Sequence, residues 1–140
     1  MSANITEQTS QLTRYLAALS QLKAMQFDQY RATAFVMDAV YGTNDLEKLT
    51  YKTLRGAKTN LKKAFGVSSL YEYIESKRLS RIEPELAALG DIVLVLDEHD
   101  DIAFCAGKQW LYFDDADLLR HDRFSVRDYE VEMLAYRLTE

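Results

Sequence analysis

The chain has 140 residues, of which 48% are apolar and 28% are charged, with one proline and five glycines. This size and composition fit a single globular domain over residues 1–140 and exclude a disordered or low-complexity chain. The net charge of −5 argues against nucleic acid or an anionic membrane as the main partner. No apolar run approaches the roughly 18 residues that a membrane helix needs, so no membrane insertion is expected.

The cysteine and histidine content restricts the possible chemistry. Cys105 is the only cysteine, which excludes an internal disulfide and a cysteine-rich zinc site. His99 and His121 lie far apart in the sequence, so no histidine-based metal site and no cofactor are expected. The first ten residues lack the basic stretch and apolar core of a signal peptide, which predicts a soluble protein made in a cytoplasm.

The first half of the chain has helical periodicity. From Glu7 to about Met25, apolar residues including Leu16 recur at helical spacing and predict an amphipathic helix. Residues 29–41 are apolar around nearly the whole circumference, which predicts a buried helix at the centre of the fold. Asp28 is placed to cap the start of this central helix.

Two further helices are expected before the sheet. The third runs from about Thr53 to Phe65, with Leu54 among its core-facing residues. The fourth follows Ser69, which forms a capping-box pattern with Glu72. The helical part therefore spans about residues 5–78.

At Gly90 the pattern changes from helical spacing to short apolar runs that are typical of strands. Strands are expected at residues 92–96, 102–106, 109–113 and 129–138, with a short element at 118–119. Short turns between consecutive strands favour an antiparallel sheet over about residues 90–138. Helices first and strands afterwards predict an α+β fold, with a helical N-terminal half packed on a small C-terminal sheet.

Several segments, in this order and spacing, resemble an uncharacterised phage family encoded among tail genes and related to NlpC-type papain-like cell-wall peptidases. The segments are Thr13–Ala18, Ala34–Val40, Tyr51–Ala57, Leu89–Val95, Ile102–Gly107 and Ala135–Leu138. The resemblance implies a papain-like fold, and it implies a place in the virion tail among other phage tail proteins.

The resemblance also locates an active site that this chain lacks. Active relatives begin the central helix with an Asp-Cys pair, because a helix N-terminus favours the thiolate. The corresponding pair here is Arg31-Ala32, and alanine supplies no nucleophile. The activating histidine of relatives corresponds to about Asp101, with His99 close by in the expected turn. The resemblance therefore implies a degenerate site at Arg31, Ala32 and Asp101, with no catalytic residue.

Other residues leave alternatives open. Cys105 lies in an apolar strand and is expected to be a buried structural thiol, although a misplaced nucleophile is the alternative. Thr33 could act as a hydroxyl nucleophile only with a strong base beside it. The acidic residues between Asp97 and Asp101 could bind calcium, but they lack the glycine and distal glutamate of an EF-hand loop. A plain hairpin turn is expected there.

Two surfaces are candidates for protein contact. Lys58, Lys62 and Lys63 belong to a basic helix face in a stretch, Thr50 to Tyr71, that contains no acidic residue. Solvation, contact with an acidic protein surface and nucleic-acid binding are the alternatives for this face. Trp110 and Tyr112 share one face of their strand and either enter the core or form a contact patch.

These observations together predict a non-catalytic structural component of a bacteriophage tail, in the distal or baseplate region, that acts through protein contacts. One alternative is a cell-wall peptidase or amidase with a non-standard active site. Another is a tail-assembly factor that is absent from the mature virion. The expected location is the virion tail after synthesis in the bacterial host cytoplasm.

Overall fold

In the computed structural model, residues 10–96, 101–113, 119–122 and 132–140 are described. Four α-helices precede most of the sheet in the described part: α2 (Gln11–Leu22), α3 (Gln29–Tyr41), α4 (Ala57–Phe65) and α5 (Leu70–Ser76). Three short 3-10 helices are η1 (Leu46–Lys48), η2 (Leu54–Gly56) and η3 (Pro84–Leu86). The strands are β1 (Ser80–Ile82), β2 (Asp91–Val95), β3 (Asp101–Cys105), β4 (Trp110–Phe113), β5 (Leu119–Asp122) and β6 (Met133–Arg137). The predicted α+β class is confirmed.

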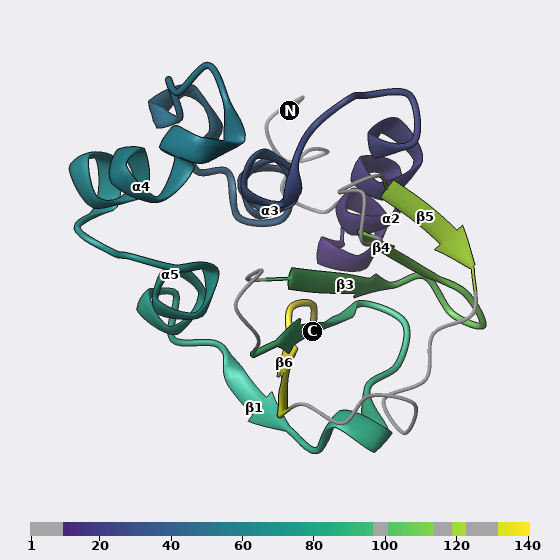
Figure 1. Ribbon diagram of the computed structural model, residues 1–140. Coiled ribbons are helices and arrows are strands. Elements are labelled where there is room, and N and C mark those ends of the chain that lie inside the picture. The colour runs from purple at the N-terminus through teal and green to yellow at the C-terminus, as the bar shows by residue number, and fades with distance from the viewer. Residues whose placement is uncertain (1–9, 97–100, 114–118, 123–131) are drawn as a thin grey trace, which may run out of the picture.

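The described strands form one antiparallel sheet in the order β1-β6-β2-β3-β4-β5. The C-terminal strand β6 therefore lies between β1 and β2, while β2 to β5 follow one another as a meander (Figure 1). Sequence periodicity did not predict β1, because a strand of three residues is too short to show alternation. Residues 129–131 of the last expected strand and Leu118 lie outside the described residues.

The helices α2 and α3 lie on the same face of the sheet, and α3 contacts β3 (Figure 1). Ile92 pairs with Phe104, and Phe104 pairs with Leu111, so these side chains share the helix-facing side. All three are fully buried in the main core. The opposite side of the central strands is also buried, with Val93 and Ala103 at 0% exposure. Burial on both faces explains why β2 is a continuous apolar run rather than an alternating one.

The helix α3 spans the residues that sequence periodicity predicts, and it packs against α2 and β3. Asp28 caps its start, and Gly42 ends it with a positive φ of 73°. In α2 the buried stripe contains Tyr15, Leu19 and Leu22. Leu16 is 40% exposed, contrary to its predicted place in the stripe, because one step along a helix rotates a side chain by about 100°.

The third expected helix differs from the prediction at its start. Residues 54–56 form the 3-10 helix η2, and α4 begins only at Ala57. A 3-10 turn has fewer residues per turn, so positions spaced for an α-helix no longer fall on one face. Leu54 is consequently 37% exposed and does not face the core. The predicted cap of α5 by Ser69 is confirmed, since the Glu72 N–H donates to Ser69 Oγ at 3.1 Å, while the Glu72 carboxylate accepts from the N–H of Ser68 at 2.8 Å.

Candidate functional site

The first turn of α3 is the place where the resemblance locates a nucleophile. The N–H of Arg31 donates to Asp28 Oδ1 at 2.9 Å, which caps the helix. Ala32 follows with 0% exposure, so its methyl group is packed inside the core. Thr33 is buried as well, and its hydroxyl donates to the carbonyl of Gln29 at 2.6 Å. This helix start therefore offers neither a thiol nor an available hydroxyl.

The side chain of Arg31 is used structurally. Its guanidinium donates to Asp28 Oδ2 at 3.2 Å and to the carbonyl of Tyr51. It also lies 3.9 Å from the centre of the Tyr51 ring, and the Tyr51 hydroxyl donates to Asp28 Oδ1 at 2.5 Å. These contacts hold the segment before α4 against the start of α3.

Asp101, the third degenerate position, is the first residue of β3 and is half-buried. It pairs with Val95 across the β2–β3 ladder. The strand β3 is in contact with α3. His99 lies outside the described residues.

Cys105 is at the other end of β3 and is 1% exposed, so the predicted burial is confirmed. Its Sγ donates to the carbonyl of Gly107 at 3.5 Å. Burial raises the pKa of the thiol, which keeps it protonated and a poor nucleophile at neutral pH. The backbone carbonyl of Cys105 accepts a hydrogen bond from the Tyr15 hydroxyl at 2.7 Å. Cys105 therefore has the surroundings of a structural residue.

The Asp28–Arg31–Tyr51 arrangement recurs at two further places. In each, a tyrosine hydroxyl donates to a carboxylate, and a cation binds that carboxylate while lying over the tyrosine ring. The three triads are Tyr51–Asp28–Arg31, Tyr73–Asp45–Lys77 and Tyr136–Glu75–Arg81. The second joins the loop after α3 to α5, and the third joins α5 to β1 and β6. Together the triads connect the helical layer to the edge of the sheet.

Electrostatics favour a neutral tyrosine in each triad and an ionised carboxylate at Asp45. Burial and then the hydrogen bond to the carboxylate raise the pKa of Tyr51, Tyr73 and Tyr136 above the ordinary value of 10.0. Burial alone would raise the pKa of Asp45, but hydrogen bonds from Lys77 and Tyr73 outweigh it and lower the pKa. These are the properties of structural networks, since the pKa of each triad tyrosine is moved up and that of Asp45 down, both away from neutral pH.

Sequence reasoning did not find the triads, because their members come from separate elements and follow no fixed spacing. The chain holds nine tyrosines. Five tyrosines donate to internal acceptors: Tyr15, Tyr41, Tyr51, Tyr73 and Tyr136. The abundance of tyrosine is thus explained in large part by internal hydrogen bonding.

The basic helix face is exposed as expected. Lys58, Lys62 and Lys63 of α4 are all exposed, and so are Lys52 and Arg55 just before it.

The aromatic strand β4 divides its residues between two faces. Leu111 and Phe113 are buried in the helix-facing core, whereas Trp110 and Tyr112 are half-buried on the opposite side.

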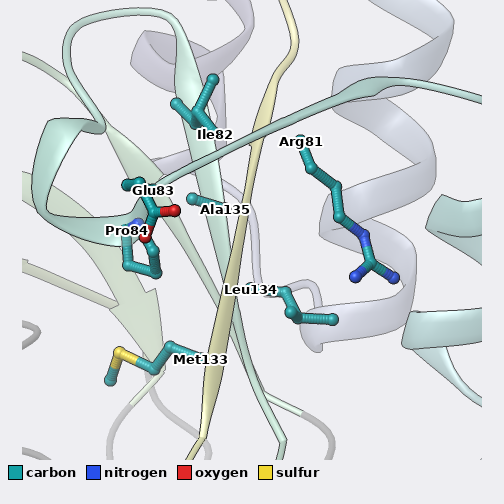
Figure 2. A pocket seen from close by; sticks show the side chains of 7 residues that line it. All are labelled: Arg81, Ile82, Glu83, Pro84, Met133, Leu134 and Ala135. Atoms are coloured by element: carbon teal, nitrogen blue, oxygen red, sulfur yellow. The ribbon is translucent and has the colours of Figure 1, made fainter.

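A pocket of about 450 Å³ lies at the β1–β6 edge of the sheet (Figure 2). The residues lining it are Arg81, Ile82, Glu83, Pro84, Met133, Leu134 and Ala135. Figure 2 shows Arg81 and Leu134 projecting to one side of the strands, and Glu83, Pro84 and Met133 to the other. The pocket contains no nucleophile and is separate from the first turn of α3.

Among the described residues, no group of three or more His, Cys, Asp or Glu side chains is arranged to hold a metal ion. The acidic residues 97–100, considered above for calcium, lie outside the described part. No helix in the described ranges has the length and apolar character required to span a membrane.

A family model described as "Domain of unknown function (DUF6950)" matches residues 6–129, and the chain therefore belongs to this family. No curated protein and no solved structure matches the chain. The family description assigns no activity.

Proposed function

We propose that the protein is a non-catalytic member of a papain-like group that works through protein contacts. The observation that carries this proposal is the first turn of α3. Ala32 supplies a buried methyl group where related peptidases supply sulfur, and Arg31 is held by Asp28 and Tyr51. A site without its nucleophile loses nearly the whole nucleophilic contribution to catalysis.

The papain-like part of the proposal has support from topology. A central helix, α3, lies against the helix-facing side of an antiparallel sheet and contacts β3, whose first residue is Asp101. Helices precede the central strands in the chain, as the plan requires. The degenerate residues Arg31, Ala32 and Asp101 therefore belong to the elements that carry catalytic groups in active relatives.

We further propose that these contacts are made in a bacteriophage tail, in the distal or baseplate region, with other tail proteins. The support for this setting is the sequence resemblance to a family encoded among tail genes. The exposed basic residues Lys58, Lys62 and Lys63 supply the contact surface. Trp110 and Tyr112 are weaker candidates, because both are half-buried in the sheet.

Mass spectrometry of purified phage particles tests this setting. The proposal predicts that peptides of the chain are recovered in stoichiometric amounts from tails. A triple Lys58→Glu, Lys62→Glu, Lys63→Glu variant should be lost from the particles, while a Lys23→Glu, Lys108→Glu variant should be retained. Complete absence of the wild-type chain from mature particles would exclude a structural role and favour an assembly factor.

A further inference from the structure

The segment from residue 52 to the end of α4 carries a group of cations that we call the basic face. Its members are Lys52, Arg55, Lys58, Lys62 and Lys63, and all five side chains are exposed. No acidic residue occurs between residues 50 and 71, and the carboxylates nearest in the chain are those of Glu47 and Glu72. The basic face therefore has one charge sign in a chain whose net charge is −5.

These cations differ from others that are neutralised within the fold. Arg31, Lys77 and Arg81 each form an ion pair with a carboxylate. Among the described residues, no carboxylate forms an ion pair with a cation of the basic face. The positive charge of this face is thus available to an outside partner.

The charges at the start of α4 act against the helix itself. Arg55 precedes the first turn and Lys58 lies in it, where the positive end of the helix dipole disfavours cations. The first turn contains no acidic residue, and no side chain caps it. Lys58 and Lys62 are four residues apart, and like charges at this spacing destabilise a helix. A local conflict of this kind is typical of residues that are used for function.

We propose that the basic face docks an acidic segment of a partner protein, with carboxylates opposite the cations and an apolar side chain against Leu54. This inference rests on the proposed function, because it names the chemistry of the partner that the α4 surface contacts. Leu54 is 37% exposed and stands next to Arg55 in the chain. Figure 1 shows α4 at the outer edge of the molecule, apart from the sheet, where a partner can approach it.

Charge balance favours an acidic protein segment over nucleic acid as the occupant. Residues 50–71 contribute +5 to a chain of net charge −5, so the remainder carries −10. The helix α4 is roughly 14 Å long, so a long polyanion laid along it would also meet that negative remainder. A short acidic segment would not. Leu54 also offers apolar contact, which a protein partner can match and a phosphate backbone cannot.

Fluorescence anisotropy with a labelled synthetic peptide tests the proposal on the full chain. The peptide is helical, about 14 residues long, with glutamates four residues apart and one leucine. A matched control peptide has glutamine in place of each glutamate. The glutamate peptide should bind the wild type, and the glutamine peptide should not. Raising salt from about 0.05 M to about 0.5 M should weaken the binding about tenfold or more, because charge attraction is screened.

The melting temperature of charge variants separates docking from a merely solvated face. Arg55→Glu, Lys58→Glu should weaken peptide binding about tenfold or more. The same variant should melt about 2 °C or more above the wild type, because carboxylates replace cations at the start of α4. Arg55→Ala, Lys58→Ala should also lose binding and should melt no lower than the wild type. The control variant Lys23→Glu, Lys108→Glu has the charge change of the first variant on exposed residues elsewhere, and it should bind as the wild type does.

A wild-type chain that does not bind the glutamate peptide at low salt would overturn the inference. So would equal weakening in the control variant, or a lower melting temperature in both α4 variants. Binding of a DNA oligonucleotide of about 20 base pairs more tightly than the peptide would also overturn it, by assigning the face to nucleic acid. If the peptide fails to bind while phage particles contain the chain, only this inference falls. If the peptide binds but particles lack the chain, the proposed tail role falls instead.

Discussion

The guanidinium of Arg31 lies 3.9 Å from the centre of the Tyr51 ring and donates to the carbonyl of the same residue. Under the proposed papain-like relationship, Arg31 takes the position of the residue that precedes the nucleophile. Its side chain instead holds the segment before α4 against the start of α3. This use of the position is the physical reason for proposing a structural rather than a catalytic role.

Replacing Arg31 by alanine should destabilise the protein. The change removes a hydrogen bond to Asp28 and one to the Tyr51 carbonyl, both partly buried. Hydrogen bonds to charged groups contribute about 1.5–3 kcal/mol, so we expect a loss of that order in the free energy of unfolding, measured by urea denaturation. Arg55→Ala, on an exposed residue, should change it by less than about 0.5 kcal/mol. Equal effects of the two variants would show that the Arg31 contacts are not stabilising.

Gly90 should tolerate alanine less well than Gly107. Both have a positive φ, of 93° and 102°, so both substitutions strain the backbone. At Gly90 the new Cβ would also lie 2.2 Å from Thr139 Oγ1, whereas nothing lies within 4 Å at Gly107. Overpacking of this kind costs about 1–3 kcal/mol, and this is the expected difference between the two variants in thermal or urea unfolding. Similar stabilities would contradict the close approach of Thr139.

The close approach of Thr139 to Gly90 is a contact that the sequence alone does not predict. Gly90 and Asp91 lie in the segment Leu89–Val95 that contributes to the resemblance, but only the fold shows what the two residues do. Gly90 provides the positive φ and the space for Thr139, and Asp91 Oδ2 accepts from the Ala88 N–H at 2.9 Å. Thr139 is distant in sequence, so a local pattern contains no information about this contact.

The central helix and the meander strands were predictable because burial determines their patterns. Residues 29–41 are apolar on nearly all sides, and β2 is buried on both faces, so periodicity alone identifies each. The edge strand β1 was not predictable, since its pairing depends on β6 from the end of the chain. At the candidate site, the burial of Ala32 in the first turn of α3 was predictable from the apolar pattern of that helix. The contact of Arg31 with Tyr51 was not predictable, because it depends on how the segment between α3 and α4 folds back to the start of α3.

Alkaline conditions should unfold the protein through the triad tyrosines. Their pKa values are raised in the folded state, so this stabilisation is fully present below pH 10 and is lost as the pH rises above it. Each such tyrosine should contribute a slope of about 1.4 kcal/mol per pH unit in the free energy of unfolding above pH 10. Tyr73→Phe should remove one such contribution relative to the wild type. An unaltered slope in Tyr73→Phe would contradict the assignment.

Low pH should weaken the Tyr73–Asp45–Lys77 triad, because its carboxylate becomes protonated. The pKa of Asp45 is lowered in the folded state, mainly because hydrogen bonds from Lys77 and Tyr73 outweigh the effect of burial. The stabilisation is therefore present above the unfolded value of about 3.9 and is lost as the pH falls through the folded pKa. At pH 7, Asp45→Asn should have a lower free energy of unfolding than the wild type. Between pH 5 and pH 2, the variant should lose less of this free energy than the wild type does. Denaturant unfolding across this pH range measures both differences. Glu47→Gln, an exposed neighbour, is the control, and an identical acid profile for Asp45→Asn and wild type would contradict the account.

The absence of catalysis is tested most directly by incubating the purified chain with peptidoglycan fragments and following released products by mass spectrometry. Because Ala32 lacks a nucleophile and Cys105 is buried with a raised pKa, we expect no release above a heat-denatured control. Cys105→Ser should behave as the wild type does. Hydrolysis by the wild type that disappears in Cys105→Ser would contradict the account and identify a peptidase with a non-standard active site.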